Sequence, residues 1–113
     1  MSYEIVAGGI TPPMKLTATV DGVAVDLSLA ETVTMLWELP DGTTREVELV
    51  GREVNDLGLG IAWRVWEAGD TGQVGTHRGQ IRAVWPVDLL DYPEILPTDG
   101  STAVWFVHPR IGD

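Results

Sequence analysis

Apolar and polar residues alternate along most of this 113-residue chain, and a period of two predicts β-strands. The clearest alternating runs are residues 16–20, 33–39, 47–50, 61–65, 81–85 and 104–107. β-Branched and aromatic residues recur in these runs, and they suit a pleated sheet with one buried face. The pattern therefore predicts an all-β protein.

Turn sequences separate the predicted strands. Asp21-Gly22 and Asp41-Gly42 are typical of tight hairpins. Between Pro86 and Pro93 there is room for one helical turn, and no longer helix is expected anywhere. Short strands that are each followed by a turn predict a single domain over residues 1–113, an immunoglobulin-like antiparallel β-sandwich of about seven or eight strands.

Charge and composition exclude several classes of partner. The net charge is −10, with 7 Lys and Arg in total, and Lys15 is the single lysine. Nucleic acids and anionic membrane surfaces both need clustered cations, so we expect neither as a partner. There are 0 Cys, which rules out disulfides and thiolate metal sites. No apolar run approaches the ~20 residues of a membrane span, and the N-terminus lacks a signal-peptide pattern.

A tight acidic turn, Asp70-Thr71-Gly72, leads through Gly75 and His77 into the strand at 81–85. Sandwich domains of the immunoglobulin type often enter a late strand through such a corner, with a ring tucked beneath it. We expect Asp70, Gly75 and His77 to form a structural corner. One ring nitrogen of His77 should bond to the backbone below the turn.

No catalytic or metal-binding constellation stands out. His77 and His108 are the only histidines, and they lack a recognisable zinc spacing. The serines lie at a terminus and in turns rather than beside a histidine base. We therefore expect no enzyme activity, no cofactor and no metal. Calcium at one of the Asp-Gly turns remains an alternative, although each has an adequate explanation as a turn.

The five tryptophans are an excess for a chain of this size. Trp37, Trp63 and Trp85 share the register of the apolar face, which predicts that they are core residues. Trp66 and Trp105 fall on the opposite register. We expect them to be exposed, as at protein interfaces or carbohydrate platforms. The alternative is that a loop or the N-terminal segment folds over them.

The connection from Pro86 to Thr98 is too apolar for a solvated loop. Its large side chains are Leu89, Leu90, Tyr92, Ile95 and Leu96. Such a segment either covers an open end of the sandwich or docks a neighbouring subunit. We therefore treat these five residues as candidate interface residues, together with Trp66 and Trp105.

The order of motifs resembles a known family. The motifs are residues 21–27 (DGVAVDL), 39–43 (LPDGT), 62–66 (AWRVW), 70–79 (DTGQVGTHRG), 94–97 (EILP) and 102–107 (TAVWFV). Over Met14 to Val107 this order is similar to the immunoglobulin-like N-terminal domain of phage baseplate upper proteins and to related small virion proteins of tailed phages. His77 stands where that family usually has tyrosine.

The resemblance implies a structural, non-enzymatic virion protein at the neck, tail or baseplate, or decorating the capsid. Its partners would be other virion proteins, and the assembled form a homo-oligomer or symmetric array. The protein would be located in the virion, assembled in the cytoplasm of a host bacterium. The second hypothesis is a carbohydrate-binding or adhesion module in which Trp66 and Trp105 stack on sugar rings.

Overall fold

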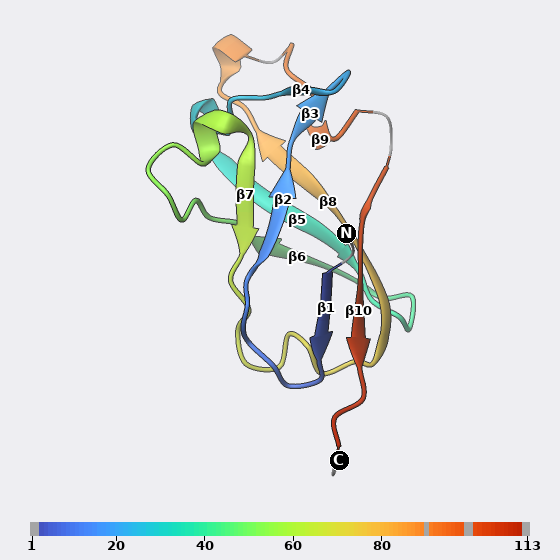
Figure 1. The fold of residues 1–113 in the computed structure, drawn as a ribbon. Helices are drawn as coiled ribbons and strands as arrows, with labels where there is room; N and C mark the ends of the chain where they lie inside the picture. The colour runs from blue at the N-terminus through green and yellow to red at the C-terminus, as the bar shows by residue number, and fades with distance from the viewer. Residues whose placement is uncertain (1–2, 90, 99–100, 112–113) are drawn as a thin grey trace.

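The computed structural model describes residues 3–89, 91–98 and 101–111, and these form a mostly β structure (Figure 1). The strands of the larger sheet, in spatial order, are β1 (Tyr3–Val6), β10 (Ala103–His108), β8 (Gly75–Val84), β5 (Thr32–Glu38) and β6 (Thr44–Glu48). A short strand, β9 (Ile95–Leu96), also pairs with β8.

A second layer lies across this sheet. It is the antiparallel pair β2 (Met14–Thr17) and β7 (Ile61–Arg64), and beside it is the hairpin of β3 (Thr19–Val20) and β4 (Val23–Ala24). The helical elements of the described segments are single 3₁₀ turns, η1 (Leu27–Leu29), η2 (Leu57–Leu59) and η3 (Val87–Leu89). The prediction of an all-β protein without a long helix is confirmed.

Two details differ from the predicted architecture. The expected sandwich was antiparallel, but β1 runs parallel to β10, so the larger sheet is mixed. β1 is the edge strand of the sheet and pairs with β10 on the side away from β8. The described residues contain ten strands, three of them only two residues long. The sequence predicts about seven or eight strands, and seven of the ten are longer than two residues.

Both predicted Asp-Gly hairpins form. In the β3–β4 hairpin Val20 pairs with Val23, and both turn residues have positive φ, at 51° for Asp21 and 80° for Gly22. Positive φ at both positions is the conformation that Asp-Gly favours. The β5–β6 turn is closed by the Asp41 carboxylate, which accepts hydrogen bonds from the Thr43 amide and hydroxyl. Local turn chemistry therefore fixes the register of both pairs.

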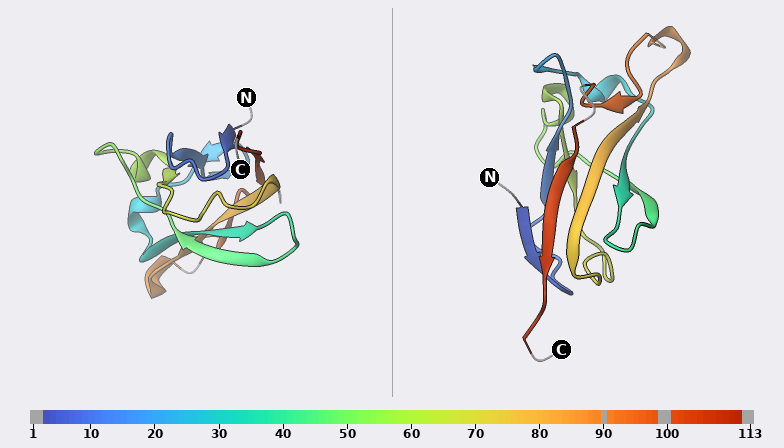
Figure 2. Two further views of the ribbon diagram at one scale, coloured as in Figure 1. Left: turned by 90° about the horizontal axis from the view of Figure 1, so that it is seen from below. Right: turned by 90° about the vertical axis from the view of Figure 1, so that its right-hand side faces the viewer.

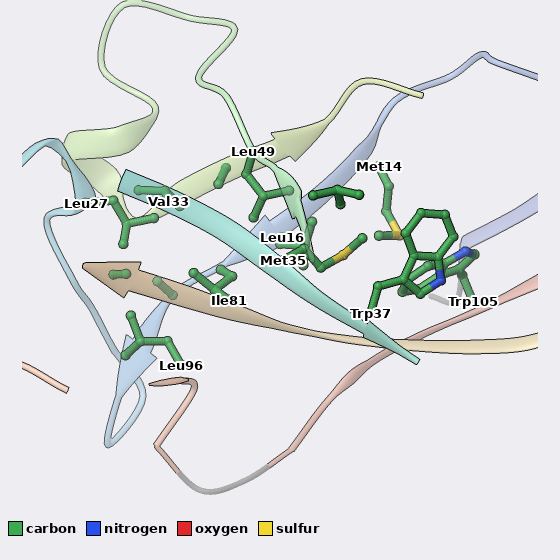
Figure 3. Close-up of a cluster of buried hydrophobic side chains, with 14 of the residues drawn as sticks. Met14, Leu16, Leu27, Val33, Met35, Trp37, Leu49, Ile81, Leu96 and Trp105 are labelled. Carbon is green, nitrogen blue, oxygen red and sulfur yellow. The ribbon is translucent and has the colours of Figure 1, made fainter. Parts of the chain in front are cut away.

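The hydrophobic core lies between the two layers (Figure 3). The larger sheet contributes alternate residues of β5 and β8, and β2 contributes Met14 and Leu16 from the opposite side. Trp37 and Trp105 fill one end of this core, and Leu27 and Leu96 fill the other. The inward-facing positions follow a period of two, as expected for strands with one buried face.

The molecule is elongated, with principal extents of 52 × 29 × 24 Å. The β3–β4 hairpin and η3 lie at one end of the long axis, and the segment after β10 reaches beyond the sheet at the other (Figure 2). The two ends therefore present different segments to solvent.

Candidate functional site

The predicted corner centres on His77, which is completely buried. Its Nδ1 accepts a hydrogen bond of 2.9 Å from the indole N–H of Trp37, and its Nε2 lies 2.9 Å from the carbonyl oxygen of Gln73. Because an indole can only donate, Nδ1 must be unprotonated and Nε2 carries the proton. Burial lowers the pKa of His77, which favours the same neutral form. The predicted bond from this ring to the backbone is confirmed.

Asp70 is buried in the same corner and accepts several hydrogen bonds. One carboxylate oxygen lies 2.7 Å from Nη2 of Arg64 and 2.8 Å from the amide nitrogen of Glu67. The other lies 3.3 Å from Nη1 of Arg45. The Arg45 guanidinium in turn lies 4.7 Å from the centre of the Trp37 ring. A continuous chain of contacts therefore joins Asp70 to His77 through Arg45 and Trp37.

Gly75 allows the backbone to turn into β8. Its φ is 132°, a value that side-chain-bearing residues rarely adopt. A Cβ here would lie 3.0 Å from Cβ of Pro40, so the space is also limited. Asp70, Gly75 and His77 therefore all contribute to one corner, as the sequence predicts.

Trp66 and Trp105 are buried, and the prediction that they are exposed is wrong. Their exposed fractions are 4% and 1%. Each ring packs at a tilt against Trp37, with centroids 5.6 and 5.8 Å away, and Trp105 also stacks on His77. The alternative that the N-terminal segment folds over them fits part of this arrangement, because the Tyr3 hydroxyl accepts a hydrogen bond from Trp66.

The reason for the error is the register of two strands. On β7 the inward side chains are Ala62 and Arg64, with Trp66 continuing the same face, whereas Trp63 is only half-buried on the outside. The prediction that Trp63 is a core residue is therefore also wrong. The alternation pattern was interpreted with every charged residue facing outward, and the buried Arg64 therefore reversed the predicted facing of this strand. We call the cluster of Trp37, Trp66, Asp70, His77 and Trp105 the aromatic corner.

The apolar connection from Pro86 to Thr98 folds back onto its own chain. Leu96 is fully buried in β9, and Leu89 and Ile95 are half-buried. The indole of Trp85 donates to the carbonyl oxygen of Pro93. The segment therefore covers part of the sandwich, as the first of the two alternatives proposed. Leu90 lies outside the described residues.

Tyr92 is the predicted interface residue that remains accessible, with 39% of its surface exposed. It packs edge-on against Trp85, with ring centroids 4.8 Å apart. Beside it a shallow pocket of about 280 Å³ opens between the β3–β4 hairpin and the connection. We call this the end pocket, and its lining residues are Val20, Ala24, Val25, Asp26, Tyr92 and Pro93.

The sequence analysis did not identify the hairpin side of this pocket. Val20 was assigned to an apolar strand face, and Asp26 received no role. The available signal was the apolar run Val23-Ala24-Val25 directly after an Asp-Gly turn in an acidic chain, and in the structure Val23 and Ala24 of this run are exposed.

A wider groove of about 560 Å³ crosses the outer face of the larger sheet over β5, β6 and β8. Glu46, Arg78 and Gln80 line it together with Leu36 and Trp37, and more of its accessible surface is apolar than polar. On the same face Arg82 bridges Glu46 and Glu94 at 3.0 and 2.7 Å. No ion pair of Glu38 or Arg78, which also line the groove, is recorded among the described residues. We prefer the end pocket as the candidate because Tyr92, an accessible residue of the predicted interface, lines it.

The structure also bears on metal and membrane chemistry. Across residues 3–89, 91–98 and 101–111, no group of three or more His, Cys, Asp or Glu side chains could hold a metal ion. No helix in the same ranges is long and apolar enough to cross a membrane.

Comparison with protein-family models, with curated proteins and with solved structures finds no match to this chain.

Proposed function

We propose that the chain is an immunoglobulin-like sandwich that serves as a structural, non-enzymatic virion protein of a tailed phage. It would act through protein–protein interfaces at the neck, tail or baseplate, or on the capsid. Other virion proteins would be its partners, in a homo-oligomer or symmetric array. The protein would be found in the virion after assembly in the host cytoplasm.

The observation that supports this proposal most is the order of the strands. β5, β8 and β10 lie side by side, as strands C, F and G do in immunoglobulin sandwiches, and β2 pairs with β7 as strand B pairs with E. β6 extends the sheet where variable-type domains add a further strand. The resemblance noted in the sequence was to a domain of this type, so fold and motif order support the same assignment.

The second hypothesis, a carbohydrate-binding module, has lost its basis. It required Trp66 and Trp105 on the surface, where their rings could stack on sugars, and both are buried in the aromatic corner. An interface role for these two residues is removed by the same observation. Tyr92 and the end pocket take their place in the proposal, because they combine apolar surface with accessibility.

Quantitative peptide mass spectrometry of purified particles tests the proposal. The chain would be measured relative to the major capsid protein, in particles of the phage whose genome encodes it. A constant copy number through successive gradient purifications is expected of a virion component. Loss of the chain during purification, in parallel with host proteins added as a control, would overturn the proposal.

A further inference from the structure

The end pocket has a fixed shape. Tyr92 is held against Trp85, and the neighbouring Pro93 carbonyl accepts the Trp85 indole N–H at 2.8 Å. The opposite wall is the β3–β4 hairpin, whose backbone is set by the Asp21-Gly22 turn. Both walls are therefore anchored to the body of the domain. A pocket of about 280 Å³ has room for an aliphatic side chain.

The surroundings of the end pocket are acidic. Asp26 lines it, Asp21 lies at the tip of the same hairpin, and Asp88 and Asp91 are exposed on the other side. Residues 19–26 and 86–98 contain no lysine or arginine. One oxygen of Asp26 caps η1 by accepting from the Ser28 amide, and no hydrogen bond to its other oxygen is recorded among the described residues. An apolar pocket in this field favours an aliphatic group that carries a positive charge beside it.

The opposite end of the molecule carries such a group. After β10, the segment at 109–111 ends the described chain with Arg110 and Ile111, both exposed. Ile111 is 101% exposed, which is costly for a large aliphatic side chain. Arg110 forms no ion pair with any described residue.

Arg110 differs in this respect from three of the six other cations of the chain, whereas no ion pair of Lys15, Arg52 or Arg78 is recorded among the described residues. Arg45 and Arg64 both pair with Asp70, and Arg82 pairs with Glu46 and Glu94. Arg52 stacks on Trp63 instead. Arg110 thus combines a charge that has no ion pair among the described residues with a neighbouring exposed aliphatic side chain, and its Nη1 lies near Gly8 of the same chain.

We propose that the end pocket binds Arg110 and Ile111 of a second copy of this chain. Ile111 would enter the pocket between Val25 and Tyr92, and the Arg110 guanidinium would pair with Asp26. The inference rests on the proposed function, because it names the contact through which such subunits would form an array.

The geometry of this contact determines what it can build. Donor and acceptor lie at opposite ends of a molecule 52 Å long, so each copy can use both at once. Such a heterologous contact produces a ring if it closes and a row if it does not. One side-chain pair buries far less than the ~1,200 Å² of a stable interface, so isolated copies should associate weakly.

Sedimentation velocity over a concentration series tests this contact with two kinds of variant. The donor variant carries Arg110→Glu and Ile111→Asp together, and the acceptor variant carries Tyr92→Lys, which places a like charge beside the pocket. The matched control is Val54→Asp, because Val54 is 100% exposed and belongs neither to the lining of the end pocket nor to the segment at 109–111. Circular dichroism and thermal melting first establish that every variant is folded.

Wild type and the Val54→Asp control should sediment faster as concentration rises. The donor and acceptor variants should each associate at least ~10-fold more weakly than wild type, which is the change expected from losing ~1.4 kcal/mol. An equimolar mixture of the two variants should recover one contact and form heterodimers without larger species.

Two results would overturn the inference: wild type that stays monomeric at every concentration, or variants that associate as wild type does. The proposed function fails on a different observation. If wild type is monomeric but present in purified particles, the contact between the end pocket and Arg110–Ile111 is wrong and the virion role stands. If wild type associates through Arg110 and Ile111 but is absent from particles, the virion role is wrong and the contact stands.

Discussion

The two ends of the core differ in how their polar groups are used. In the aromatic corner, Asp70 and His77 are buried and every ring nitrogen of His77 has a partner within the chain. At the end pocket, Asp26 and Tyr92 are accessible to solvent. The second carboxylate oxygen of Asp26 has no recorded hydrogen bond among the described residues. The comparison teaches that accessibility separates the two regions: the corner is buried even though the indole N–H of Trp105 has no recorded hydrogen-bond partner, whereas the polar groups of the end pocket can be reached from solvent.

The difference also predicts how substitutions should divide. Changes in the aromatic corner should alter the free energy of unfolding with no direct effect on association. Changes at the end pocket and the Arg110 segment should alter association with little effect on folding. The predictions below start with the largest expected change in stability and end with the smallest.

Asp70→Ala should destabilise the fold most. It leaves the Arg64 guanidinium buried without its carboxylate, and breaking a buried pair in this way typically costs ~3–5 kcal/mol. Urea unfolding followed by tryptophan fluorescence measures the loss. Glu94→Gln is the control, because it weakens an exposed pair with Arg82 and should change stability far less. Equal losses in the two variants would show that the buried pair has no special role.

Gly79→Ala should destabilise the protein by ~1–3 kcal/mol through overpacking. A Cβ at this position would lie 2.7 Å from the Met35 sulfur and 3.2 Å from the Trp105 ring. Gly58→Ala is the matched control, since its Cβ would have only the Asp26 carboxylate within reach, at 3.8 Å. Thermal melting of both variants checks the prediction, and a Gly79→Ala protein as stable as wild type would contradict this packing.

The stability contributed by His77 should be lost in acid. The pKa of His77 in the folded protein is lowered by burial, so above its ordinary value of ~6.5 neither state binds a proton there. Below that pH the unfolded chain takes up a proton that the folded chain resists. The free energy of unfolding should therefore fall by up to ~1.4 kcal/mol per pH unit.

Urea unfolding between pH 7 and 5.5 measures this slope. His77→Gln should flatten it, whereas His108→Gln, which removes the exposed pair with Glu4, serves as the control. The pKa values of Asp41 and Glu46 are lowered by hydrogen bonds from Thr43 and Thr34, so their contributions are lost only at lower pH. A slope that persists in His77→Gln would exclude this histidine as its source.

Arg110→Ala and Ile111→Ala should leave the free energy of unfolding within ~0.5 kcal/mol of wild type, because exposed side chains without partners contribute little to folding. Both should nevertheless weaken self-association in sedimentation velocity. A clear loss of stability in either variant would mean that the segment packs on its own domain instead.

The strands, the hairpins and the corner could be predicted because local chemistry determines them. Alternation identified β5 and β8, and Asp-Gly turns fixed two registers without reference to the rest of the fold. The path of β1 could not be predicted in the same way. Its parallel pairing with β10 joins segments about a hundred residues apart, for which the local pattern contains no information.

Tertiary contacts determine on which face of the sheet the side chains of Trp66 and Trp105 lie. Val104 and Phe106 are as apolar as Trp105 and Val107, so alternation on β10 cannot decide which pair is buried. Gly79, which pairs with Ala103 on β10, leaves room for the Trp105 ring on the inner face, because a Cβ at this position would lie 3.2 Å from that ring. A glycine inside a strand signals such close approach, and it was the available indication.

The most direct test of the division between the two ends compares matched aromatic truncations, Trp105→Leu in the corner and Tyr92→Leu at the end pocket. For each variant, the free energy of unfolding and the concentration dependence of sedimentation are measured on the same sample. The account predicts that Trp105→Leu is the far less stable protein but still associates while folded, and that Tyr92→Leu is nearly as stable as wild type but monomeric. A Tyr92→Leu protein that is strongly destabilised yet associates normally would contradict it.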